Sequence, residues 1–288
     1  MTDPASEPRV WFITGCSTGF GRELAKAVLA LGERVVATAR NVEQVQDFEQ
    51  SGPELARALP LDVTDLGQVS EAVDHALDAF GRIDVGVNNA GYGSMGAVEE
   101  VHEEEIRRQF EVNVFGVLNV TRAVLPHMRE MQSGHVVNIS SVGGFVGVPG
   151  FGIYNGTKFA VEGISEALAQ EIEPLGIRVT IVEPGAFRTD WAGRSLAAAP
   201  EIEDYRETVG QTREYIANEN GDQQGNPRLA AEAMISAVEA DVPPLRLPLG
   251  EDALGMIREK LDSMKREIDA WETTIIETSF EHSATEQE

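Results

Sequence analysis

Short apolar segments rich in Val and Ile recur along the chain, and a segment with helical spacing of apolar residues follows nearly every one. The apolar segments are residues 9–14, 34–39, 56–63, 83–87, 135–140 and 177–183, with 245–247 as a candidate last strand. The helical segments are residues 22–31, 42–50, 65–80, 103–131, 154–172 and 229–240, with Asp65 as the expected N-cap of the third. Strands that are apolar throughout are typical of a parallel sheet buried on both faces and joined by right-handed crossovers. The sequence therefore predicts an α/β fold with a doubly wound parallel sheet in one domain.

The first apolar segment runs without a gap into a glycine-rich loop and then into a helix. Gly15, Gly19 and Gly21 stand in this loop, and the missing Cβ atoms let the backbone approach a pyrophosphate. The N–H groups and the dipole of the helix then receive the negative charge. The spacing G-x-x-x-G-x-G differs from the common G-x-G-x-x-G fingerprint, so a tight strand-to-helix turn is the alternative interpretation.

A second glycine-punctuated loop carries a serine at one end and a Tyr-x-x-x-Lys pair at the other. Tyr154 and Lys158 lie one turn apart on one face of a predicted helix, and Ser141 stands where the loop can fold back toward them. An ammonium close to a phenol favours the phenolate, so we expect the pKa of Tyr154 to fall from about 10 toward neutrality. Such a group gives and takes protons. The alternative is a chance pair.

Two stretches that contain asparagine are also candidate functional positions. Asn88, Asn89, Ala90 and Gly91 follow the fourth strand, where a backbone passing close to a cofactor is favoured over a simple turn. Asn113 lies inside the long predicted helix, although Asn is a poor helix former. A local helix defect with a functional carbonyl or water site is one interpretation, and a solvated polar residue is the other.

The remaining reactive side chains give weaker signals. Cys16 follows the first strand, where a small residue filling a tight loop is favoured over a thiol activated by a helix N-terminus. The histidines show no ligand spacing, so we predict no metal site and expect them at surface or helix-end positions. They are His75, His102, His127, His135 and His282.

Charge and cysteine content exclude several classes of function. With 23 Lys and Arg against 48 Asp and Glu, the formal charge is -25, which repels nucleic acids and anionic lipids. A solvated acidic face is the ordinary explanation, and adaptation to high salt is the alternative. A single cysteine forbids an intramolecular disulfide, and no apolar run approaches the ~18 residues of a membrane span. The expected location is the cytoplasm, and neither a nucleic acid nor a membrane is an expected partner.

Taken together, these motifs resemble the short-chain dehydrogenase/reductase family over about residues 9–250. The resemblance rests on their order and spacing: Thr14-Gly15-x-x-x-Gly19-x-Gly21, Asn88-Asn89-Ala90-Gly91, Asn113, Ser141, Tyr154-x-x-x-Lys158 and Pro184-Gly185. It implies a Rossmann-like fold in which Tyr154 is the general acid/base and Ser141 binds the substrate oxygen. Lys158 would lower the pKa of Tyr154 and hold the nicotinamide ribose, and Asn113 would support a water-linked proton relay to Lys158.

The same resemblance implies a nicotinamide cofactor. Its expected binding residues are Gly15, Ser17, Gly19, Gly21, Arg40, Asp62, Asn89, Ala90, Gly91, Tyr154, Lys158, Pro184, Gly185 and Thr189. Ala39 stands where the family's NAD users place Asp, and the guanidinium of Arg40 can grip a 2′-phosphate by two hydrogen bonds. NADP(H) is therefore favoured. NAD(H) stays an alternative, because Arg40 can also cap the sheet edge or stack on the adenine.

The expected domain runs over residues 9–250 and includes a helical substrate lid at about 186–228, which is polar, acidic and broken by Asn-Gly and Gly-Asn-Pro. Residues 251–288 form an extension outside the resemblance, with an acidic amphipathic helix at 253–276 and a frayed tail at 277–288.

The predicted function is NADP(H)-dependent interconversion of a small carbonyl compound, a ketone or aldehyde, and its alcohol. A regulatory protein that senses NADP(H) without turnover is the alternative. A purely structural partner protein would need neither the glycine loop nor the Tyr154–Lys158 pair. The helices at 103–131 and after Tyr154 carry apolar residues on more than one face: Val112, Phe115, Val117, Leu118, Phe159, Val161, Ile164 and Leu168. In the resembled family these helices pack against their copies, so a homodimer or homotetramer is expected.

Overall fold

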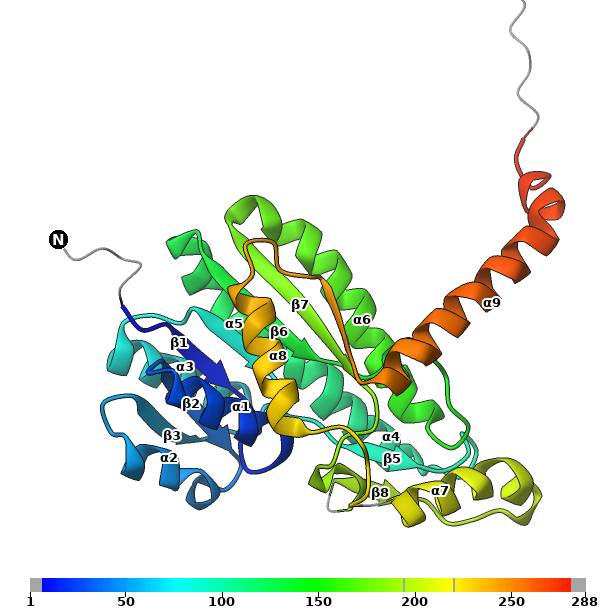
Figure 1. Ribbon diagram of the computed structural model, residues 1–288, viewed down its shortest axis with the longest axis horizontal. Helices are drawn as coiled ribbons and strands as arrows, with labels where there is room; N and C mark the ends of the chain where they lie inside the picture. The colour runs from blue at the N-terminus through cyan, green and yellow to red at the C-terminus, as the bar shows by residue number, and fades with distance from the viewer. Residues whose placement is uncertain (1–6, 194, 220, 281–288) are drawn as a thin grey trace, which may run out of the picture.

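A seven-stranded parallel sheet forms the centre of the molecule (Figure 1). The computed structural model describes residues 7–193, 195–219 and 221–280. Within this part of the chain the strand order is β3-β2-β1-β4-β6-β7-β9. The strands are β1 (Val10–Ile13), β2 (Arg34–Ala39), β3 (Ala56–Pro60), β4 (Val85–Asn88), β6 (Gly134–Ile139), β7 (Ile177–Pro184) and β9 (Arg246–Leu249). The order doubles back at β1 and β4, so the predicted doubly wound fold is confirmed.

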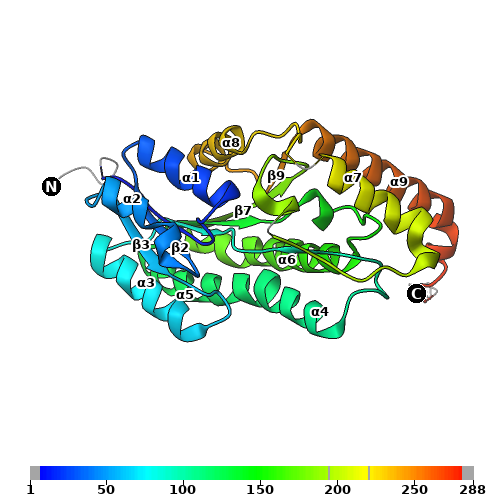
Figure 2. The same ribbon diagram turned by 90° about the horizontal axis from the view of Figure 1, so that it is seen from below.

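Helices cover both faces of this sheet (Figure 2). On one face lie α1 (Gly19–Ala30) and α8 (Pro227–Glu239), together with α2 (Gln46–Ser51) near the β3 edge. The other face carries α3 (Leu66–Phe80), α4 (Glu103–Phe110), α5 (Gly116–Met131) and α6 (Gly152–Ile172). Asp65 caps α3 as predicted, because its side chain accepts hydrogen bonds from the N–H groups of Gly67 and Gln68.

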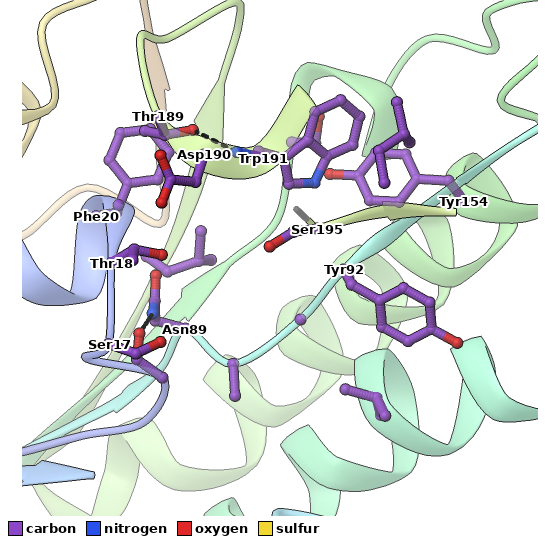
Figure 3. A pocket seen from close by; sticks show the side chains of 18 of the residues that line it. Ser17, Thr18, Phe20, Asn89, Tyr92, Tyr154, Thr189, Asp190, Trp191 and Ser195 are labelled. Atoms are coloured by element: carbon purple, nitrogen blue, oxygen red, sulfur yellow. Dashed lines mark hydrogen bonds between the residues drawn. The ribbon is translucent and has the colours of Figure 1, made fainter. Parts of the chain in front are cut away.

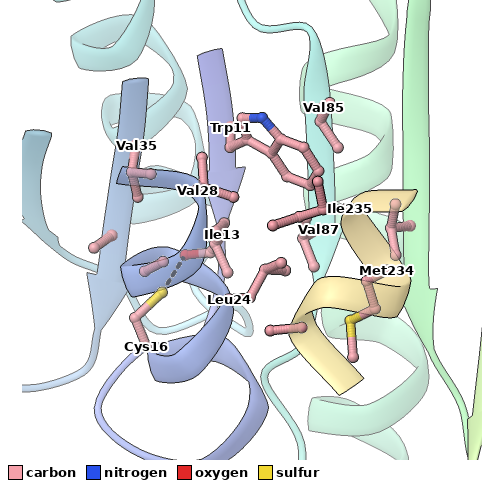
Figure 4. Close-up of a cluster of buried hydrophobic side chains, with 14 of the residues drawn as sticks. Trp11, Ile13, Cys16, Leu24, Val28, Val35, Val85, Val87, Met234 and Ile235 are labelled. Carbon is pink, nitrogen blue, oxygen red and sulfur yellow. Dashed lines mark hydrogen bonds between the residues drawn. The ribbon is translucent and has the colours of Figure 1, made fainter. Parts of the chain in front are cut away.

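Each face of the sheet has its own hydrophobic core because side chains alternate along a strand. In β1, Trp11 and Ile13 join the cluster under α1 and α8, which Figure 4 shows from close by. Val10 and Phe12 join the cluster under α3 and α5. All four are at most 1% exposed. Burial on both faces explains why the sequence of this strand is apolar throughout.

The long helix predicted at 103–131 is interrupted. A π-helical turn at Glu111–Phe115 separates α4 from α5, and Asn113 lies within this turn. The helix predicted at 42–50 is likewise divided, into a 3₁₀ turn at Val42–Gln44 and α2. π-Helical turns inside helices are frequent at functional sites, which agrees with the interpretation of Asn113 as a local defect.

The lid contains more structure than the sequence indicated. A parallel two-stranded sheet joins β5 (Gly93–Met95) to β8 (Leu196–Ala198), and neither strand was predicted. Each has three residues, which is too short to show a periodic pattern. The rest of the lid is built from 3₁₀ turns at Asp190–Ala192 and Glu203–Tyr205, a π-helical turn at Arg206–Gly210, and α7 (Gln211–Glu219).

The last described helix is the long α9 (Glu251–Ile276), which projects away from the sheet at the β9 edge (Figure 1). The predicted helix at 253–276 is thus present, while most of the predicted tail, residues 281–288, lies outside the described residues. Among the described helices, none combines the length and apolar character needed to cross a membrane. The division of the chain near residue 250 stays a prediction.

Candidate active site

A cavity of about 1100 Å³ opens at the carboxyl ends of the parallel strands. The loops that follow β1, β2, β3, β4, β6 and β7 all contribute to its wall. This is the place where α/β sheets bind ligands, next to the point at which the strand order reverses. The volume exceeds that of most single-ligand pockets, so the cavity has room for a large cofactor together with a small substrate.

The glycine loop after β1 lies tightly against the loop after β4. Gly15 has a φ of 71°, which side chains rarely adopt, and an added Cβ would lie 2.9 Å from the Cα of Ala90. At Gly21 an added Cβ would meet the Asn89 amide and the Gly15 carbonyl oxygen, 2.6 Å away. Only glycine fits these two positions. The loop is therefore a cradle of bare backbone at the start of α1, and its shape fits a pyrophosphate.

Polar side chains of Thr14 and Asn89 hold this cradle together. The Thr14 hydroxyl accepts hydrogen bonds from the N–H groups of Asn89 (2.9 Å) and Ala90 (3.0 Å). The Asn89 amide donates to the carbonyl oxygens of Thr14 (2.8 Å) and Gly15 (3.0 Å). The neighbouring Asn88 is buried and donates to Asn138 and Thr121. The side chains of Asn88 and Asn89 thus fix the strand ends, and residues 89–91 line the cavity.

Ser141 and Tyr154 meet at the cavity wall. Ser141 accepts a hydrogen bond from the N–H of Gly143 (3.0 Å), so its own proton is available for its bond to the Tyr154 hydroxyl. Asn155, which follows the tyrosine, donates to the Gly143 carbonyl (2.9 Å) and accepts from Val148 N (2.8 Å). The helix that carries Tyr154 therefore locks the loop that carries Ser141. The sequence analysis did not single out Asn155.

Burial dominates the electrostatics of Tyr154 and Lys158. Burial raises the pKa of Tyr154 to about 12, although the hydrogen bond from Ser141 acts to lower this pKa. Burial also lowers the pKa of Lys158 to about 8, and the charge of Glu162 opposes that change. The expectation that Lys158 brings the tyrosine toward neutrality is corrected here. Its Nζ donates to the Ile139 carbonyl (2.8 Å) and lies 5.8 Å from the centre of the tyrosine ring.

Asn113 lies behind the cavity wall and is 1% exposed, so the solvated interpretation is wrong. Its side chain donates to the Tyr92 carbonyl (2.8 Å) and the Thr157 hydroxyl (3.1 Å) and accepts from Tyr92 N (3.1 Å). A Cβ added at Gly91 would lie 3.1 Å from Asn113 Oδ1 and 3.7 Å from Lys158 Nζ. The π-helical turn thus brings this amide close to both Lys158 and the loop that follows β4.

The other predicted cofactor-binding residues surround the same cavity. Its lining includes Ser17, Gly19, Arg40, Asp62, Ala90, Gly91, Pro184, Gly185 and Thr189, whereas Gly21 and Asn113 support it from behind. Arg40 is exposed at the end of β2, after the buried Ala39. The Asp62 carboxylate accepts hydrogen bonds from the N–H and hydroxyl of Thr64. The structure brings the predicted residues together, and their roles stay predictions.

Aromatic residues that the sequence analysis missed close the cavity (Figure 3). The ring of Trp191, from the lid, lies 5.2 Å from that of Tyr154 and 5.7 Å from that of Phe151. Phe20, after the glycine loop, packs edge-on against Phe187 at 5.1 Å. Tyr92 follows Gly91 on the opposite wall. These residues come from separate segments and form no periodic pattern in the sequence, so only their proximity in the fold identifies them.

A buried ionic cluster lies beneath Lys158. Arg246 of β9 is hydrogen-bonded to Glu162 of α6 and, at 2.8 Å, to Glu183 of β7. Burial raises the pKa of Glu162 to about 7, and Glu183 acts in the same direction. The guanidinium of Arg246 opposes this rise. The cluster ties the helix that carries Tyr154 and Lys158 to two strands of the sheet.

Two residues considered for other roles have structural ones. The Cys16 thiol is buried and donates a hydrogen bond to the Ile13 carbonyl. Burial raises the pKa of this thiol to about 12, so an activated thiol is excluded. His135 was expected at the surface, which is wrong: it lies in β6, 5% exposed, against Thr180. Within the described residues, no three His, Cys, Asp or Glu side chains gather as metal ligands would.

Comparison with known proteins agrees with this geometry. The family model described as "short chain dehydrogenase" matches residues 9–199. "Oxidoreductase BOA17" of Botryotinia fuckeliana is 40% identical over 91% of this chain and 96% of its own length. The crystal structure of a short-chain dehydrogenase from Streptomyces avermitilis is 44% identical, with a TM-score of 0.90, and the match covers 95% of this chain and 99% of that one.

Two similar structures contain nicotinamide cofactors. A short-chain dehydrogenase from Burkholderia cenocepacia in complex with NADP is 27% identical, with a TM-score of 0.71, over 92% of this chain and 97% of that one. The 3-ketoacyl-(acyl-carrier-protein) reductase of Brucella melitensis, complexed with NADH, is 30% identical, with a TM-score of 0.71, over 84% and 96%. These neighbours support a nicotinamide cofactor without distinguishing its two forms.

Proposed function

The chain belongs to the short-chain dehydrogenase family, and from this premise we propose that it interconverts a ketone or aldehyde and its alcohol with NADP(H). The family membership makes it an oxidoreductase acting on CH–OH or C=O groups. The observation that carries the proposal is the meeting of the Ser141 and Tyr154 hydroxyls beside the glycine cradle, in one cavity. The cofactor, when bound, supplies the hydride chemistry.

In this proposal the chain's own residues hold the reacting carbonyl and supply its proton. Ser141 and Tyr154 donate hydrogen bonds to the carbonyl oxygen, and Tyr154 transfers its proton to that oxygen as negative charge develops there. Because burial raises the pKa of Tyr154 to about 12, the phenol is protonated at neutral pH. A protonated phenol is the state that carbonyl reduction requires of its proton donor.

Lys158 and Asn113 act around this pair. Lys158 is anchored to the Ile139 carbonyl and lies close to both the tyrosine ring and the Gly91 backbone, which suits the predicted contact with the cofactor's ribose. Asn113 fixes the Tyr92 backbone and the Thr157 hydroxyl, so we assign it the positioning of the loop that follows β4. The glycine cradle with Ser17 and Thr189 would hold the pyrophosphate.

We favour NADP(H) because Arg40 stands at the cavity rim and Ala39 supplies no carboxylate. Within the described residues Arg40 makes no ion pair, so its guanidinium is available to a 2′-phosphate. The double variant Ala39→Asp with Arg40→Leu should move the ratio of kcat/KM values toward NADH by at least ~10-fold, as expected for the loss of one charge-assisted contact. Arg108→Leu, at another arginine of the cavity, is the control and should leave the ratio unchanged. A wild type that already prefers NADH would contradict the assignment.

We further propose a homodimer or homotetramer in the cytoplasm, acting on small molecules. Phe115 and Phe159 are 49% and 46% exposed and lie on adjoining helical segments, which supports pairing of this face with a second copy. Light scattering that gives a monomer mass at micromolar concentration would remove this part of the proposal. NADPH consumption measured across a panel of ketones and aldehydes is the experiment that tests the function as a whole.

A further inference from the structure

The projecting part of α9 carries a row of large apolar side chains. Leu261, Met264, Ile268, Trp271 and Ile275 are between 42% and 64% exposed. Only the beginning of the helix packs on the body, where Ala253 is fully buried and Ile257 is 8% exposed. From Met264 to the end of α9 every described residue is exposed. The other residues that the structure describes therefore leave the row uncovered, as Figure 1 shows for the helix as a whole.

The row has the period of a coiled coil. Its apolar positions alternate in steps of three and four residues: Leu254, Ile257, Leu261, Met264, Ile268, Trp271 and Ile275. A strict 3-4 alternation gives a narrow seam that faces another helix, whereas a helix that covers a globular core has a wider apolar face. The seven positions continue from the buried Ile257 into solvent without a break. A helix of matching period is the partner that fits this seam.

We propose that the α9 seam, residues 261–275, binds the same seam of a second copy of this chain in antiparallel orientation. Charge distribution decides both the partner and the orientation. Residues 258–266 contain four basic and two acidic side chains, whereas residues 267–277 contain four acidic and no basic ones. A parallel pair would place like halves together, whereas an antiparallel pair places the basic half of one helix against the acidic half of the other.

The period also fixes a register for the projecting part. In an antiparallel pair the two apolar positions of the heptad face each other, so Ile268 packs against the partner's Trp271 and Met264 against the partner's Ile275. In this register Lys265 faces the partner's Glu272, and by symmetry the opposite contact also forms. Within its own helix Lys265 pairs only with the exposed Asp269, at 2.6 Å, which leaves it able to exchange partners.

A membrane surface suits the same seam less well. Helices that lie on membranes carry a polar face rich in Lys and Arg. Over Glu251–Ile276 this helix has seven acidic and four basic side chains, so anionic headgroups repel it. The seam is short, about 22 Å at 1.5 Å per residue, so association is expected to depend on concentration in the micromolar range.

Sedimentation of the full chain between 1 and 100 μM tests the proposal with a matched pair of variants. Ile268→Lys places a charge in the seam, whereas Ala270→Lys places the same charge on the exposed polar side of the same helix. Wild type and Ala270→Lys should double in average mass as concentration rises. Ile268→Lys should weaken this step roughly 30-fold or more, as loss of an interface hot spot does. Equal behaviour of Ile268→Lys and wild type overturns the proposal, as does an equal loss in both variants.

A charge exchange identifies the second copy and its orientation. Lys265→Glu and Glu272→Lys should each weaken association when alone, because each leaves two like-charged contacts. An equimolar mixture should restore it, because both contacts in the mixed pair are then complementary. A mixture that associates no more strongly than its components overturns the antiparallel pair.

Flotation of wild type, but not of Ile268→Lys, with phosphatidylcholine vesicles would overturn the proposal in favour of a membrane. Circular dichroism and cofactor binding, which these substitutions in the projecting part of α9 should leave unchanged, check folding.

Discussion

Replacement of His135 by Gln should remove a pH-dependent loss of stability. His135 is 5% exposed in the centre of the sheet, and its Nε2 lies 2.9 Å from the Thr180 hydroxyl. That hydroxyl donates its single proton to the Pro244 carbonyl (2.8 Å), so its oxygen accepts from the histidine. The Nε2 atom of His135 therefore carries a proton. Burial lowers its pKa to about 4, and the nearby charges of Arg178 and Arg9 act in the same direction.

The size of the effect follows from linkage. The folded pKa, about 4, is lower than the unfolded value of 6.5, so the unfolded chain binds more protons between these values. Stability from this group is therefore present above pH 6.5 and is lost as the pH falls toward 4. Between pH 7.5 and pH 5.0 the wild type should lose about 2 kcal/mol of unfolding free energy through His135, from 1.36 kcal/mol per pKa unit.

Urea unfolding at these two pH values measures the effect at fixed protein concentration. Glu162 titrates in the opposite sense, because burial raises its pKa to about 7, so the wild-type curve alone mixes two contributions. The difference between wild type and His135→Gln isolates the histidine and should fall by about 2 kcal/mol from pH 7.5 to pH 5.0. His102→Gln, the same change at an exposed residue, should follow the wild type. A wild type minus His135→Gln difference that does not change with pH would refute the reasoning.

Three further predictions concern the cavity and its supports. Gly21→Ala places a Cβ against Asn89 and 2.6 Å from the Gly15 carbonyl oxygen, so cofactor affinity by calorimetry should fall at least ~10-fold, whereas Gly255→Ala, in open space, should not change it. Glu162→Gln removes the charge that raises the pKa of Lys158, so the alkaline limb of the pH profile of kcat/KM should move to lower pH. Glu166→Gln, at the exposed partner of Arg246, is the control, and an alkaline limb at the same pH in both variants would contradict this prediction. Asp252→Ala removes the carboxylate that accepts a hydrogen bond from the N–H of Ala186 at 2.7 Å, so the KM for the cofactor should rise while kcat changes little. An equal rise in KM in Glu251→Ala would refute a specific role for the Asp252–Ala186 hydrogen bond.

The sheet was predictable because its strands carry their own signal. Residues 34–39 match β2 at both ends, since Val35, Val36 and Ala37 are buried on both faces of the sheet and give the segment a continuous apolar run. Asp65 marked the start of α3 because an N-cap is a local hydrogen bond within three residues. The sequence also predicted the glycine loop of the cavity, Ser141, Tyr154 and Lys158. Each of these depends on a particular type of residue at a fixed spacing.

The rest depends on contacts between distant segments. Trp191 reaches Tyr154 only because β8 pairs with β5, a pairing of two three-residue strands about a hundred residues apart. His135 can be buried because the Thr180 hydroxyl on the neighbouring strand accepts a hydrogen bond from its ring, which neither segment alone indicates. The pKa of Tyr154 was misjudged for the same reason: the spacing places Lys158 nearby, but burial sets the upward direction, and the contact with Ser141 only opposes it.

The most direct test of the proposed chemistry is the turnover of Tyr154→Phe with the best carbonyl substrate found for the wild type. The substitution keeps the buried ring and removes only the hydroxyl that faces Ser141. Turnover should fall by about 10² or more, as expected for loss of a general acid, while cofactor binding measured by calorimetry survives. Turnover near the wild-type rate would contradict the assignment of Tyr154 as the proton donor.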